Sequence, residues 1–151
     1  MKIEDELQTK KFKNEQHKAA LNVMFTAYRV HTRVARALKP YGVTAEQYNV
    51  MRILKGSSPR SMCVKEIAGR MIERNSNVPR ILDRLQAKAY VTRTRSESDG
   101  RETLIRLTDE GVTLLAEVSR KVAEVDGASV NLTDTEARLL NELLDKSRNR
   151  E

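Results

Sequence analysis

The chain has 151 residues, of which 39% are hydrophobic and 32% charged, and its formal net charge is +7. A chain of this length can bury the core of one domain, and its single cysteine, Cys63, cannot form an internal disulfide. No apolar run approaches the roughly 20 residues of a membrane span, and residues 1–20 lack the apolar segment of a signal peptide. These observations exclude an integral membrane protein, a secreted disulfide scaffold and a collagen-like fibre, and we expect a cytoplasmic protein without a membrane partner.

The first half of the chain has the apolar spacing of helices. Apolar residues recur at steps of three and four over 21–38, which predicts a long helix ended by the following Pro-Tyr-Gly sequence. Thr44 and a glutamine three residues later predict a capping box that opens a second helix over 44–55. Two short helices joined by a tight turn are predicted at 64–71 and 76–88, the second with Asn75 or Ser76 as its N-cap.

The second half changes from helix to hairpin and back. Residues 90–95 and 102–107 have the composition of strands, and the Asp-Gly sequence between them is typical of a hairpin turn. Thr108 is the predicted N-cap of a helix that we expect Gly127 to interrupt. A further capping box predicts a final helix over 133–144. The fold is therefore mainly α (α+β), with the element order of a winged helix-turn-helix.

The charge is unevenly distributed along the chain. Residues 60–106 contain 11 basic and 6 acidic side chains, whereas residues 107–151 contain 6 basic and 10 acidic ones. A basic central segment favours a polyanionic partner such as double-stranded DNA. A solvated helix face would give the same composition, so charge alone does not decide.

The predicted helix over 76–88 carries side chains suited to reading bases. Its polar face holds Asn77, Arg80 and Arg84, and asparagine and arginine can pair bidentately with adenine and guanine edges in the major groove. The hairpin is expected to bring Arg93, Arg95 and Arg101 near one tip, where an arginine can enter a narrow minor groove. The alternatives are an ordinary solvated face and a surface ion pair in the hairpin.

The block 43–111 resembles the MarR family of bacterial transcriptional regulators. The matching segments are VTAEQYNVMRIL (43–54), VKEIAGRM (64–71), NVPRILDRLQAKAYVTRT (77–94) and SDGRETLIRLTDEG (98–111). The last segment is the most specific, because it contains the wing pattern of an aspartate, one residue, an arginine, a strand and Leu-Thr-x-x-Gly.

The resemblance implies a winged helix-turn-helix DNA-binding domain at 43–107, flanked by dimerisation regions at 1–42 and 108–151. It implies that Ser76–Lys88 is the recognition helix and that Asp99 orients Arg101 toward the minor groove. The residues expected to contact DNA are Lys65, Ser76, Asn77, Arg80, Arg84, Arg95 and Arg101. Ala89 stands where the family usually has a glycine, so we expect the end of that helix to differ in angle.

The resemblance also implies a homodimer with a small anionic or phenolic effector between the dimerisation helices and the winged domain. The polar groups expected there are Tyr28, His31, Tyr48 and Arg52. For His31, a core or interface histidine is the alternative. Cys63 is expected to be an inert, partly buried thiol; a redox-sensing role is the alternative, although the chain has no second cysteine to resolve a sulfenic acid.

The sequence offers little for catalysis. It has two histidines without metal-ligand spacing and no glycine-rich phosphate loop, so we predict no enzyme, no metal and no cofactor. The predicted function is a sequence-specific, ligand-responsive repressor that binds a near-palindromic operator as a homodimer. The alternatives are a sequence-tolerant architectural DNA binder and a winged-helix adaptor between proteins.

Overall fold

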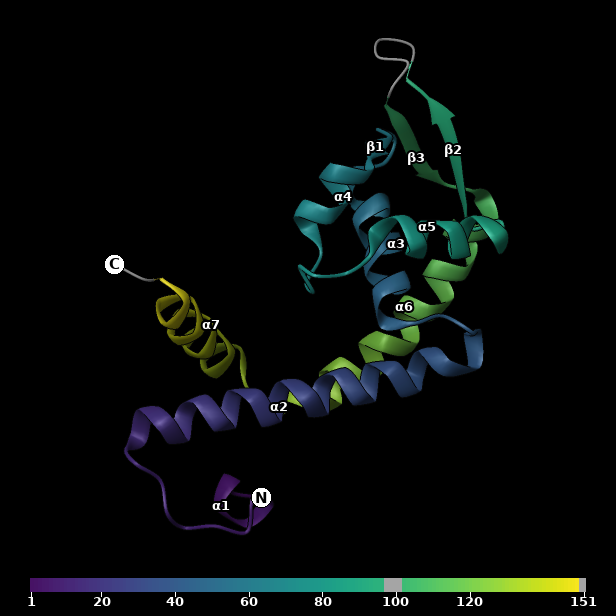
Figure 1. Cartoon of the computed structure of the whole chain (residues 1–151). Helices are drawn as coiled ribbons and strands as arrows, with labels where there is room; N and C mark the ends of the chain where they lie inside the picture. The colour runs from purple at the N-terminus through teal and green to yellow at the C-terminus, as the bar shows by residue number, and fades with distance from the viewer. Residues whose placement is uncertain (97–101, 150–151) are drawn as a thin grey trace.

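The longest helix of the chain runs along one side of the molecule (Figure 1). The computed structural model describes residues 1–96 and 102–149. A short helix, α1 (Ile3–Glu6), precedes the 24-residue helix α2 (Glu15–Leu38). A 3-10 turn, η1 (Lys39–Tyr41), follows α2, and Gly42 then takes the left-handed conformation with φ 64°. The predicted end of this helix at the Pro-Tyr-Gly sequence is thus confirmed, and the helix begins six residues earlier than its apolar stripe.

Three helices and a small sheet form the domain above α2 in Figure 1. The helices are α3 (Ala45–Ser57), α4 (Val64–Arg70) and α5 (Val78–Ala87). The capping box of α3 is confirmed, because the Gln47 amide donates to Thr44 Oγ1 at 3.2 Å and the Thr44 amide donates to Gln47 Oε1 at 3.2 Å. The N-cap of α5 is neither Asn75 nor Ser76 but Asn77, since Asn77 Oδ1 accepts from the Arg80 amide at 3.1 Å.

The sheet has three antiparallel strands in the order β1-β3-β2. These are β1 (Met62–Cys63), β2 (Val91–Arg95) and β3 (Thr103–Leu107). The register places Val91 opposite Leu107 and Arg95 opposite Thr103, so the predicted hairpin is confirmed. The two-residue β1 was not predicted, because two residues are too few to show the alternation of a strand.

One apolar core joins the three helices to the sheet. Its buried side chains come from these helices and strands and from the helix after the hairpin: Val50, Met51, Leu54, Met62, Ile67, Met71, Val78, Leu82, Leu85, Val91, Ile105 and Leu115. Burial of a side chain of this size stabilises the fold by about 1.5–3 kcal/mol. The core therefore fixes the orientation of α4 and α5 relative to the hairpin.

Two helices follow the hairpin, α6 (Asp109–Val130) and α7 (Asp134–Arg148). Thr108 caps α6 as predicted, with its hydroxyl accepting from the Gly111 amide at 3.0 Å. The expected interruption at Gly127 is wrong, because α6 continues through it to Val130. A second apolar cluster, built on Leu38, Val118 and Val122, packs α6 against the end of α2.

Helix α7 stands apart from the rest of the chain (Figure 1). Its predicted capping box is confirmed, since the Thr133 amide donates to Glu136 Oε2 at 2.8 Å and the Glu136 amide donates to Thr133 Oγ1 at 3.4 Å. Its leucine stripe remains exposed. In the part of the chain that the structure describes, no helix is both long enough and apolar enough to span a membrane. The predicted fold class, mainly α with a small hairpin sheet, is confirmed.

Candidate nucleic-acid interface

Helices α4 and α5 form two helices joined by a short turn, with α5 exposed along one side. Val78, Leu82 and Leu85 hold α5 on the core, and each of them is at most 2% exposed. Because these residues occupy one face of the helix, Arg80 and Arg84 are exposed on the other. One face of α5 is therefore packed on the core and the opposite face exposes the two arginines, as the sequence predicted.

The first turn of α5 differs in detail from the prediction. The Asn77 side chain is exposed, but its amide oxygen is already the cap of the helix, so only its NH₂ group is free of the capping bond. The Ser76 hydroxyl oxygen is buried and has no hydrogen-bond partner in the described part of the chain. Lys65 is exposed on α4. Contact of these residues with DNA stays a prediction.

Arg93 does not lie near the tip of the hairpin, which corrects the expectation from the sequence. It pairs with Ile105 in the middle of β2, and its guanidinium turns back toward α5. There Arg93 Nη2 donates to Asp83 Oδ1 at 2.7 Å and to the Pro79 carbonyl at 3.4 Å. Arg93 thus connects the hairpin to the exposed face of α5.

The end of the hairpin is only partly described. Arg95 is exposed at the end of β2, opposite Thr103. Asp99 and Arg101, which the resemblance implies are the wing contacts, lie outside the described residues. Their roles remain predictions.

The C-terminal end of α5 is also tied to its neighbours. Lys88 Nζ donates to the Gly42 carbonyl. Ala89 has φ 59°, the left-handed conformation that glycine adopts most easily, and the Tyr90 amide donates to the Leu85 carbonyl at 3.0 Å. Alanine thus takes here the conformation in which a glycine would end the helix, and the expected change of angle at this helix end stays a prediction.

Two carboxylates near the interface have lowered pKa values. Hydrogen bonds from its own amide and from Thr44 hold the pKa of Glu46 below its ordinary value, and the charges of His31 and Arg84 act in the same direction. Ion pairing with Arg60 at 2.7 Å, together with the Cys63 amide, lowers the pKa of Glu66. Both carboxylates are therefore ionised at neutral pH.

Two arginines near the turn are engaged within the fold. Arg70 Nη1 donates to Ser57 Oγ at 3.0 Å, and Arg74 donates to the Gly69 carbonyl. His31 Nε2 lies 3.7 Å from a carboxylate oxygen of Glu73 in the turn before α5. The turn between α4 and α5 is thus stabilised by the hydrogen bonds of Arg70 and Arg74, and His31 of α2 lies close to it.

The four residues expected in an effector pocket lie on two helices. Tyr28 and His31 are exposed on α2, and Arg52 is exposed on α3. Tyr48 is half-buried, and its hydroxyl donates to Ser119 Oγ at 3.3 Å. Cys63 is half-buried at the start of α4, and among the described residues no group of three or more His, Cys, Asp or Glu is placed to hold a metal ion.

Comparison with known proteins identifies relatives that match most of this chain in sequence. Residues 34–118 match the family model of the transcriptional regulators SarA/Rot. The HTH-type transcriptional regulator MgrA of Staphylococcus aureus is 32% identical over 138 residues, which cover 88% of this chain and 92% of MgrA. This match extends beyond the helix-turn-helix into both flanking helical regions.

Solved structures share the fold at lower sequence identity. A mutant of MarR from E. coli, complexed with operator DNA, superposes with a TM-score of 0.79 at 22% identity, covering 92% of this chain and 99% of that one. BpsR of Bordetella bronchiseptica, whose DNA binding is regulated by 6-hydroxynicotinic acid, has a TM-score of 0.75 at 18% identity. That match covers 85% of this chain and 91% of BpsR.

Proposed function

Because the chain belongs to the SarA/Rot family of transcriptional regulators, within the wider MarR group of winged helix-turn-helix proteins, we propose that it represses transcription by binding a near-palindromic operator as a homodimer. The family consists of regulators and not of enzymes. The chain is accordingly a DNA-binding transcriptional regulator; the operator symmetry, the repression and the response to a ligand are proposed here.

The observation that carries the proposal is the exposed cationic face of α5. Arg80 and Arg84 lie on it, and the core residues beneath fix its direction. An α-helix fits the major groove, and arginine there reads guanine by two hydrogen bonds. Arg95 at the end of β2 and Arg101 in the hairpin would contact the flanking backbone or minor groove.

Exposed apolar side chains support the homodimer. On α2, Met24 and Tyr28 are each 68% exposed, and on α7 Leu139 and Leu143 are 56% and 55% exposed. Both helices therefore present apolar faces that nothing in the described chain covers. A second copy would cover them and place two α5 helices about one turn of DNA apart, roughly 34–36 Å.

A small anionic or phenolic effector is proposed to regulate the dimer, acting in the cytoplasm. Such a ligand changes DNA binding only if it favours one spacing of the two recognition helices over another. The regulation of BpsR by 6-hydroxynicotinic acid supports this class of effector.

The test is a band-shift titration with genomic fragments, followed by the Arg80→Ala variant on a bound fragment. We expect the variant to lose about 1–3 kcal/mol of binding free energy on that fragment and much less on random duplex. Arg120→Ala on α6 is the matched control, because it removes one exposed positive charge outside the interface.

Two results would contradict parts of this proposal. Equal losses on the specific and random duplexes would remove the base contact and favour a sequence-tolerant architectural binder. Sedimentation of the free protein at the mass of one chain, 17.2 kDa, would remove the homodimer.

A further inference from the structure

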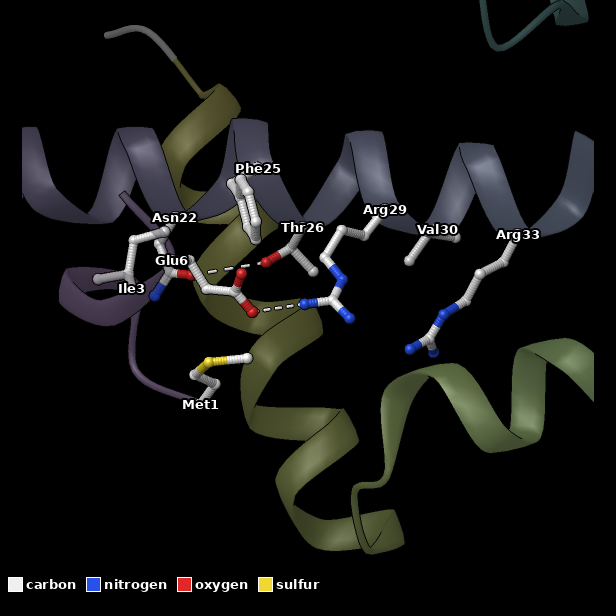
Figure 2. Close-up of a pocket in the computed structure, with 9 residues that line it drawn as sticks. All are labelled: Met1, Ile3, Glu6, Asn22, Phe25, Thr26, Arg29, Val30 and Arg33. Carbon is white, nitrogen blue, oxygen red and sulfur yellow. Dashed lines mark hydrogen bonds and ion pairs between the residues drawn. The ribbon is translucent and has the colours of Figure 1, made fainter. Parts of the chain in front are cut away.

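A cavity of about 200 Å³ lies between the N-terminal segment and the middle of α2 (Figure 2). Ile3, which is 6% exposed, and Glu6 line it from α1, while Phe25, Arg29 and Arg33 line it from α2. Figure 1 places α1 on the opposite side of α2 from the sheet and the recognition helix. The cavity is therefore separate from the nucleic-acid interface.

The cavity already contains one carboxylate bound to a guanidinium. Glu6 Oε1 accepts from Arg29 Nη1 at 2.5 Å, and the Glu6 side chain is only 18% exposed. The Arg29 guanidinium also lies 5.8 Å from the centre of the Phe25 ring. The N-terminal segment is held on α2 by a second pair, Glu4 with Lys18 at 2.5 Å. The wall of the cavity thus combines a fixed cation with an aromatic ring.

Arg33 provides a second guanidinium one helical turn further along α2. Figure 2 shows both arginine side chains extending from α2 toward the same side. The Arg33 side chain is half-buried, and among the described side chains (1–96, 102–125 and 131–149) its guanidinium has neither a carboxylate partner nor a hydrogen bond. A partly desolvated guanidinium without a counter-ion favours binding of an anion, and its planar fork matches a carboxylate.

We propose that this cavity binds a small organic carboxylate that carries a ring. The carboxylate would pair with Arg33, and the ring would lie on the side of the cavity toward Arg29 and Phe25 (Figure 2). A cavity of this size limits the ligand to about ten non-hydrogen atoms, well below the size of a typical drug. The site deepens the proposed function, because it offers a place for an anionic effector outside the set Tyr28, His31, Tyr48 and Arg52.

The experiment is calorimetric titration of the full chain with benzoate, without DNA, and with benzamide as the uncharged isostere. We expect benzoate to bind at least about tenfold more tightly than benzamide. Arg33→Gln should weaken benzoate binding at least about tenfold, and Arg33→Lys should weaken it less, because lysine keeps the charge without the fork. Arg36→Gln, an exposed arginine on α2 that does not line the cavity, should change it less than twofold.

Three outcomes overturn the site: no benzoate binding by the unmodified chain, undiminished binding by Arg33→Gln, or equal loss in Arg36→Gln. The band-shift titration is measured separately, so each failure can be assigned. Loss of benzoate binding with an intact band shift removes this site only, whereas absence of a band shift removes the proposed function.

Discussion

Replacing Ala89 with glycine should stabilise the protein. Ala89 lies just after α5 with φ 59°, and its amide donates to the Gln86 carbonyl at 2.9 Å. This is the conformation of a glycine that ends a helix, and an alanine in it places Cβ close to the following carbonyl oxygen. Glycine has no Cβ, so the variant keeps the hydrogen bonds and removes the strain.

The expected gain is a difference between two effects. Left-handed backbone costs a residue other than glycine about 1–2 kcal/mol. Glycine in turn makes the unfolded chain more disordered, which costs about 0.4–1 kcal/mol. Because Ala89 is exposed, loss of its methyl group removes no core contact. The net stabilisation should be about 0.5–1 kcal/mol.

Urea unfolding at one fixed protein concentration measures this gain, because the stability of a dimer depends on concentration. With a slope of about 2 kcal/mol per molar, the midpoint of Ala89→Gly should rise by about 0.25–0.5 M. Ala116→Gly is the matched control; Ala116 is exposed in the middle of α6, where glycine should cost about 0.5–1 kcal/mol. If both variants lost stability equally, the argument from backbone strain would be refuted.

Three further changes test contacts around α4, α5 and the hairpin. Gly111→Ala should cost about 2–3 kcal/mol of unfolding free energy in urea, since a Cβ there would lie 2.1 Å from a backbone oxygen. Gly56→Ala, in open space within α3, should instead gain up to about 0.5–1 kcal/mol, and equal effects of the two changes would contradict the close approach at Gly111. A double-mutant cycle of Asp83→Asn and Arg93→Gln should give a coupling of about 0.5–1 kcal/mol in unfolding free energy, and a coupling near zero would show that the pair does not hold the hairpin. Because the pKa of Glu66 is lowered in the folded state, its ionised form contributes stability that is complete above about pH 5 and is lost as the pH falls through that pKa. The urea midpoints of the unmodified chain and of Glu66→Gln should therefore converge on acidification. A gap that stays constant with pH would contradict this.

The helix starts could be predicted because each depends on hydrogen bonds between residues three apart. Thr44, Thr108 and Thr133 all cap the helices expected of them. The hairpin was equally local, since its two strands are neighbours in sequence and pair in register. Such features need no knowledge of the rest of the fold.

The errors arose where distant residues decide the local structure. Arg93 turns away from the hairpin tip because Asp83, on another element, accepts its hydrogen bond. Gly127 does not end α6, because a single glycine costs a long helix only about 1 kcal/mol.

The candidate site could be predicted in outline but not in its contacts. The sequence placed Arg80 and Arg84 on the exposed face of a recognition helix, since the apolar residues of that helix fix the opposite face. It could not show that the Asn77 oxygen is used as a cap, or that Lys88 reaches the Gly42 carbonyl. The cavity beside Arg33 gave no sequence signal, because it depends on how α1 folds back on α2.

The root of the hairpin has a mechanical consequence. The Thr108 amide donates to the Tyr90 carbonyl at 3.1 Å, the Thr108 hydroxyl donates to the Ala89 carbonyl at 2.6 Å, and Gly111 lies directly against Tyr90. These contacts join the hairpin directly to α6, with no flexible linker between them. We therefore expect any tilt of α6 to turn the paired strands β2 and β3 in the same direction.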